Sequence, residues 1–109
     1  MVGLGGIAVE ILKDVALAPA PVSAERARAL IDSLRAAPLF TGARGRPRLD
    51  VDAVVEGVVR VSWLAADLGP RLVDLEVNPL IVRREGGGAV AVDGRGTLAD
   101  RHHKEELPT

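Results

Sequence analysis

"RLVDLEVNPLIVRREGGGAVAVDG", residues 71–94, is the stretch that decides the fold. Apolar and polar residues alternate on both sides of a polar, glycine-rich turn, and this pattern is typical of a β-hairpin. We centre the turn on Gly86 and Gly87. That register places Asp93 opposite Leu80, so the second arm of the hairpin ends beside the middle of the first.

The first arm of this hairpin carries oxygen donors on one face. Asp74, Glu76 and Asn78 alternate with apolar residues, so the polar and apolar sets lie on opposite sides of the strand. Asp93 adds a carboxylate close to Asn78. Hard oxygen ligands suit Mg²⁺ or Mn²⁺, and magnesium needs only one or two protein ligands besides water and phosphate. A solvated strand face and ordinary Asn-Pro turn chemistry would give the same pattern, so alternation alone leaves both interpretations open.

A helix is predicted from Ser23, a typical N-cap residue, to about Ala36. Apolar residues follow the cap at helical spacing, which gives the helix one apolar face. Pro38 is expected to end this helix. A loop rich in glycine and arginine follows over residues 39–50.

A second helix is predicted over residues 51–68, with Asp50 as its N-cap. Six valines in this segment favour a strand. Its length, its cap, its apolar face and the Gly69-Pro70 stop favour a helix, and we choose the helix. Ser62 is the one polar residue on the apolar face.

The chain opens on glycines that resemble a dinucleotide-binding turn. The pattern G-x-G-G-x-A begins at Gly3, but a dinucleotide fingerprint needs a preceding strand, and only Met1 and Val2 precede it. We therefore favour a glycine turn that leads into one or two strands over residues 7–19, with a break at Lys13-Asp14. A dinucleotide site is the less favoured alternative.

Composition limits the classes of function. The 109 residues include no cysteine, which excludes disulfides, thiolate zinc sites and a cysteine nucleophile. A net charge of −1 and 2% aromatic residues offer neither general attraction to nucleic acid nor stacking platforms for bases. No apolar run approaches the roughly 20 residues of a membrane span, and we expect a cytoplasmic protein. The expected fold is one α+β domain, a small mostly antiparallel sheet with two helices packed on one face.

Four stretches, taken in order, resemble a known family. They are GLGGIAVEILKDVALAPAPVS from Gly3, LFTGARGRPRLDVDAV from Leu39, LEVNPLIV from Leu75 and AVAVDG from Ala89. Their order resembles the C-terminal half of the ATP-grasp domain of ADP-forming acyl-CoA synthetases. E-x-N-P-L followed by a strand ending in D-G is also similar to the β subunit of succinyl-CoA synthetase. The resemblance covers about residues 2–96.

This resemblance implies the conversion of acid, CoA and ATP to acyl-CoA, ADP and phosphate, with ATP or ADP and Mg²⁺ (or Mn²⁺) as cofactors. It implies that Asn78 and Asp93 are metal ligands. Glu76 lies beside them, either as a further ligand or as a base that contacts the ligands and not the metal. The N-terminal ATP-grasp lobe and the CoA-binding and ligase domains would come from the same parent protein or from a partner chain. The 109 residues alone would then be inactive. Uncovered apolar surface would favour a homodimer. The alternative function is a non-catalytic binding or regulatory module derived from this lobe.

The resemblance also assigns residues to the nucleotide. Gly5, Gly6 and Glu10 match a glycine turn of the family, which is either a structural turn or a phosphate contact. Arg44 and Arg46 match an R-G-R-P loop, which either clamps phosphate or docks against a neighbouring domain. We expect residues 1–98 to form the lobe and residues 99–109 to be a polar, mobile tail.

Overall fold

The structure, a computed structural model, describes residues 1–4 and 14–100. The helices are α2 (Ala24–Asp32), α3 (Ala37–Phe40) and α4 (Val51–Leu68), with 3-10 turns at Ala43–Gly45 and Gly69–Arg71. The strands are β1 (Val2–Gly3), β2 (Val15–Ala16), β3 (Leu72–Val77), β4 (Leu80–Val82), β5 (Ala89–Ala91) and β6 (Gly94–Leu98). All strand pairs are antiparallel, namely β1 with β2, β3 with β6 and β4 with β5. The predicted α+β class is confirmed.

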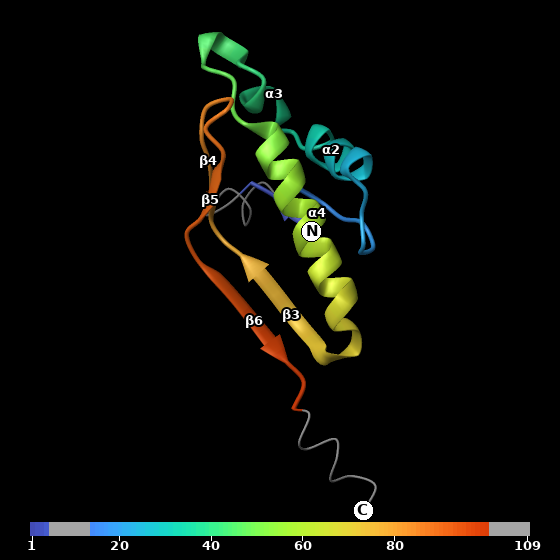
Figure 1. Cartoon of the computed structure of the whole chain (residues 1–109). Helices are drawn as coiled ribbons and strands as arrows, with labels where there is room; N and C mark the ends of the chain where they lie inside the picture. The colour runs from blue at the N-terminus through green and yellow to red at the C-terminus, as the bar shows by residue number, and fades with distance from the viewer. Residues whose placement is uncertain (5–13, 101–109) are drawn as a thin grey trace, which may run out of the picture.

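Helix α4 lies between the long hairpin and α2 (Figure 1). It spans the predicted residues, and Asp50 caps it by accepting a hydrogen bond from the backbone N–H of Ala53 at 3.1 Å. Its length and cap outweigh the strand preference of its valines. The polar residue on its apolar face is also explained, because the Ser62 hydroxyl accepts from the N–H of Val22 at 3.0 Å. None of the helices in the described part of the chain is long and apolar enough to cross a membrane.

Helix α2 begins where the sequence predicts and ends earlier. The Ser23 hydroxyl accepts from the N–H of Arg26 at 3.0 Å, which confirms the cap. The helix stops at Asp32, and Pro38 lies in the first turn of α3, so the prediction that Pro38 ends the helix is wrong. Proline is tolerated there because the first N–H groups of a helix have no partner within the helix.

Asp14 explains this break between α2 and α3. Its carboxylate is 6% exposed and accepts two backbone hydrogen bonds, from Arg35 at 2.7 Å and from Ala36 at 2.9 Å. Ala36 is the N-cap of α3 and offers no side-chain oxygen of its own. A carboxylate from a distant part of the chain therefore accepts from the backbone N–H groups of the two residues that precede α3.

The predicted hairpin is present, but its register differs by two residues. Leu80 pairs with Ala91 rather than with Asp93. The loop closes through the N–H of Arg83, which donates to the carbonyl of Gly88 at 3.0 Å. Gly86 and Gly88 both have a φ of 82°, a conformation that glycine adopts without strain. The hairpin also continues beyond its predicted end, because β6 pairs with β3 along its length.

The core gathers at one end of the molecule. Its buried residues come from α2, from the segment before it and from the start of α4 (Val22, Ala27, Ile31, Val54 and Val55). Leu80 and Val82 of β4 pack against this cluster from the hairpin side. Gly3 lets β1 approach β2 closely, because a Cβ there would lie 2.7 Å from the carbonyl oxygen of Asp14. Strands were predicted over residues 7–19. Residues 7–13 of that range lie outside the described residues, and β2 lies within the rest of it.

Candidate functional site

The hairpin has two halves, β3 paired with β6 and β4 paired with β5. The predicted oxygen donors lie at the junction where these halves meet. Asn78 follows β3 and lies opposite Asp93, which precedes β6, and the N–H of Asn78 donates to the carbonyl of Asp93 at 3.0 Å. The corrected register thus brings these two residues closer than the predicted one did. Glu76 lies one alternation before Asn78, opposite Arg95. Residues directly opposite in an antiparallel pair carry their side chains on the same face.

Glu76 has two partners on this face. Its Oε1 accepts a hydrogen bond from Nδ2 of Asn78 at 3.1 Å. Its Oε2 lies 3.8 Å from Nη2 of Arg95. Both side chains of the ion pair are largely exposed, so we expect the pair to add little to the stability of the fold. It places the Arg95 guanidinium beside the Glu76 carboxylate.

A surface hollow adjoins these residues. Carboxylate, guanidinium and hydroxyl groups of β3 and β6 line it together with two glycines (Asp74, Glu76, Gly94, Arg95, Gly96 and Thr97). Arg95 and Thr97 were not among the predicted residues, because the hairpin was expected to end at Gly94. Their positions could have been read from the alternation had the strand been extended.

The donor set at the junction fits a small hard cation. An amide oxygen from Asn78 and carboxylate oxygens from Asp93 and Glu76 are of the type that Mg²⁺ prefers. Within residues 1–4 and 14–100, no three Asp, Glu, His or Cys side chains gather as a metal cluster. The protein would thus provide few ligands, as is usual for magnesium held jointly with phosphates.

The arginine loop lies at the other end of the hairpin. Leu49 pairs with Arg84, which is six residues beyond Asn78 and so roughly 20 Å from it along a strand. Arg46 is exposed just before this bridge, and Arg44 falls in the neighbouring 3-10 turn. The structure therefore does not bring Arg44 and Arg46 together with the oxygen donors. Gly5, Gly6 and Glu10 lie outside the described residues.

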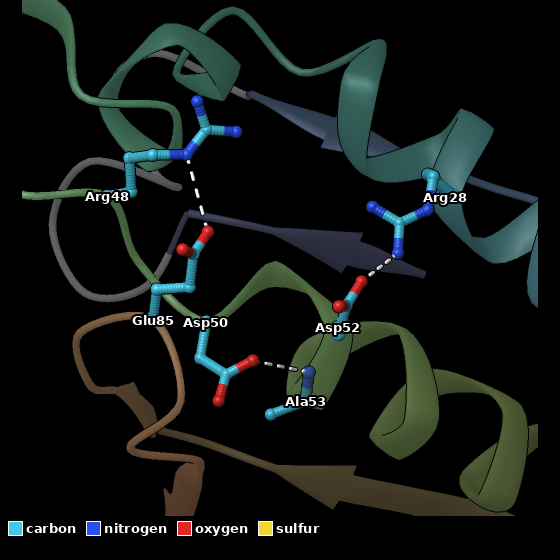
Figure 2. A network of polar contacts seen from close by, with 6 residues as sticks. All are labelled: Arg28, Arg48, Asp50, Asp52, Ala53 and Glu85. Atoms are coloured by element: carbon cyan, nitrogen blue, oxygen red, sulfur yellow. Dashed lines mark hydrogen bonds and ion pairs between the residues drawn. The ribbon is translucent and has the colours of Figure 1, made fainter.

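Asp50 connects the hairpin turn to α4, a role that the sequence did not reveal. One of its oxygens caps α4, and the other accepts from the N–H of Gly88 at 2.8 Å. Its own N–H donates to the carbonyl of Arg83 at 2.8 Å. Figure 2 shows this cap close to the ion pair of Arg48 with Glu85, whose atoms are 3.4 Å apart.

A further ion pair in Figure 2 joins Arg28 of α2 to Asp52 of α4. Together these contacts fix both the turn and α2 to the start of α4. The hairpin that carries the oxygen donors is therefore attached to the start of α4 through its turn.

Comparison with known proteins assigns the chain to a family. Residues 1–98 match the model of an ATP-grasp domain. The β subunit of ADP-forming acetate–CoA ligase II from Pyrococcus furiosus is 44% identical over 95 residues, which are 87% of this chain and 40% of that protein. The β subunit of ligase I from the same organism is 40% identical over 98 residues, 90% of this chain and 41% of that protein.

Solved structures agree. A protein of Pyrococcus horikoshii is 40% identical, with a TM-score of 0.85 over 91% of this chain and 41% of its own. Acetyl-coenzyme A synthetase 1 of Ca. Korarchaeum cryptofilum, in complex with coenzyme A and Mg-AMPPCP, is 31% identical with a TM-score of 0.81, covering 89% and 44%. The chain thus spans less than half the length of each of these relatives.

Proposed function

The chain belongs to the ATP-grasp family, and on that premise we propose that it is the C-terminal lobe of an ATP-grasp domain in an ADP-forming acyl-CoA synthetase. The parent enzyme would convert acid, CoA and ATP to acyl-CoA, ADP and phosphate. The identity to two acetate–CoA ligase β subunits supports this reaction class. The lobe would comprise residues 1–98, and residues 99–109 would lie outside it. Because ATP and CoA are its substrates, we place the enzyme in the cytoplasm.

The observation that carries the proposal is the opposition of Asn78 and Asp93 across the hairpin. Their oxygens would hold Mg²⁺, with Glu76 beside them. When bound, the ion would neutralise phosphate charge and fix the phosphates of ATP or ADP for transfer. The fit rests on the donor chemistry, which offers hard oxygens and few protein ligands and thus leaves coordination positions for phosphate and water.

The other assigned residues divide into two groups. We propose that Gly5, Gly6 and Glu10 form the turn near the phosphates that the family resemblance implies. Arg44 and Arg46 are expected to dock against a neighbouring domain, because their loop lies roughly 20 Å along the hairpin from Asn78. Long side chains alone would not bridge that distance to phosphates held at the metal.

The rest of the enzyme would come from outside this chain. The relatives are more than twice its length. We propose that the first lobe of the nucleotide site and the CoA-binding and ligase domains belong to the same parent protein or to a partner chain. We therefore expect no acyl-CoA synthesis by the chain alone, and recovery of activity with the missing parts. Acyl-CoA formation from ATP by the isolated chain would contradict this assignment.

Paramagnetic broadening of NMR signals tests the metal end of the site. Mn²⁺ added with ADP should broaden the signals of Asn78 and Asp93 first, because the effect falls steeply with distance. Asp93→Ala should reduce the broadening, whereas Asp67→Ala, at an exposed position near the end of α4, should leave it unchanged. Broadening centred elsewhere would refute the proposed site. No response, even with the missing lobe present, would favour a regulatory module without nucleotide.

A further inference from the structure

Asn78 has an amide with two unlike ends, and only one of them can bind a cation. The carbonyl oxygen Oδ1 is an acceptor with lone pairs, whereas Nδ2 carries two hydrogens and is a donor. If the amide turned by half a revolution, it would present hydrogens to the ion. A metal site built on an asparagine therefore needs something that fixes the orientation of the amide.

Glu76 meets that need. A carboxylate only accepts hydrogen bonds, so the amide end that faces it must be the NH₂ group. Nδ2 of Asn78 lies 3.1 Å from Oε1 of Glu76 and donates to it. The oxygen Oδ1 is then turned away from Glu76.

Arg95 holds Glu76 in turn. Its guanidinium lies 3.8 Å from Oε2, the oxygen that does not accept from Asn78. Register supports the arrangement, since Glu76 and Arg95 are directly opposite each other on β3 and β6. Both oxygens of Glu76 are therefore engaged by protein groups.

We propose that Glu76 is a positioning residue, which acts through Asn78 and is not itself a metal ligand. This inference rests on the proposed function, because it presupposes a cation at Asn78 and Asp93. Partners that orient metal ligands are a general feature of metal sites, and their loss typically weakens metal affinity by about 10–100-fold. The sequence left two roles open for Glu76, and the hydrogen bond to Asn78 favours the supporting one.

Replacing Asn78 by aspartate separates the two roles. A carboxylate has two equivalent oxygens, so it presents an oxygen to the ion whichever way it turns. A positioning residue thus becomes unnecessary in Asn78→Asp, whereas a direct ligand stays necessary. A double-mutant cycle measures how far the effect of Glu76→Ala on metal affinity depends on Asn78→Asp.

The experiment is a Mn²⁺ titration of the full 109-residue chain, followed by electron paramagnetic resonance of the free ion. Glu76→Ala should weaken binding by about tenfold when residue 78 is asparagine. In the Asn78→Asp background, it should change affinity no more than Asp74→Ala does. Asp74→Ala is the matched control, because it removes a carboxylate from the same face two residues away. Circular dichroism verifies that each variant is folded.

Two outcomes would overturn different claims. An equal, large loss in both backgrounds would make Glu76 a direct ligand and refute the positioning role. Absence of Mn²⁺ binding by the folded wild-type chain, also with ADP and the missing lobe present, would instead refute the proposed metal site.

A readout without metal tests the contact itself. In the wild-type chain, one Nδ2 proton of Asn78 should have a downfield NMR shift that Glu76→Ala abolishes. A signal that Glu76→Ala leaves unchanged would also refute the inference.

Discussion

The two halves of α4 lie in different surroundings. Its first turns pack between α2 and β4, and Val54 and Val55 are 8% and 6% exposed there. From Glu56 to Asp100 no residue is buried. Trp63 and Leu64 in the second half of the helix are 53% and 45% exposed.

The hairpin repeats this contrast. Leu80 and Val82 of β4 pack against the core, whereas Val73 of β3 is 63% exposed and Leu98 of β6 is 51% exposed. Apolar residues placed on an incompletely covered face are typical of a surface that another part of a protein covers. The buried end therefore accounts for the stability of the chain, and the open end carries the candidate site. The chain spans about 40% of its relatives, and the expected cover is the part of those relatives that it does not match.

The largest expected difference between the two ends comes from the same substitution made at each. Leu34 is 5% exposed in the core, and Leu64 is 45% exposed on the open half of α4. Leu34→Ala should lower the free energy of unfolding by about 2–5 kcal/mol, because it leaves a cavity. Leu64→Ala should lower it by less than about 1 kcal/mol. Urea unfolding measures both, and similar losses would contradict the division into a buried and an open end.

A second expected loss concerns Asp14, which ties β2 to the start of α3. Asp14→Ala should cost about 1–3 kcal/mol, because two partly buried N–H groups lose a charged acceptor. Asp14→Asn keeps one acceptor oxygen and should lose less. Asp67→Ala, at an exposed position on the open half of α4, is the control, with an expected change within about 0.5 kcal/mol. Equal effects at Asp14 and Asp67 would remove Asp14 from this role.

A smaller effect is expected at Asp50, which joins the two ends. Asp50→Ala should cost about 1–2 kcal/mol through the lost cap and the lost contact with Gly88. Asp50→Asn can still cap α4 through its amide oxygen but should expose the N–H of Gly88 to faster hydrogen exchange. NMR-detected exchange at Gly88 distinguishes these effects. Unchanged exchange in both variants would show that Asp50 does not hold the turn.

The sequence predicted the features that depend on neighbouring residues. Ser23 and Asp50 cap the helices as expected, since a cap bonds to an N–H only three residues away. The segment of α4 was predicted as a helix despite its six valines, because its cap and its length favoured a helix. That Asn78 and Asp93 lie close together was predicted from the hairpin and the family resemblance, although the predicted register placed Leu80 opposite Asp93.

Features that depend on distant contacts were missed. Asp14 acts on residues 21 and 22 positions away, and no local pattern announces that contact. The hairpin register was wrong by two residues because three consecutive glycines permit several turns. The contact of Asp50 with Gly88, 38 residues along the chain, is what favours one of them. The pairing of Arg95 with Glu76 was not predicted, because β6 extends beyond the predicted end of the strand.

The central claim is that the open end of this chain is completed by the missing part of the domain. Amide hydrogen exchange tests it most directly, first on the chain alone and then with the part of the Pyrococcus furiosus β subunit that the chain does not match. Protection should rise over residues 61–78 and 93–98 and stay unchanged over residues 24–55. Unchanged exchange over residues 61–78 and 93–98 in a complex that forms, or a rise confined to residues 24–55, would contradict the account.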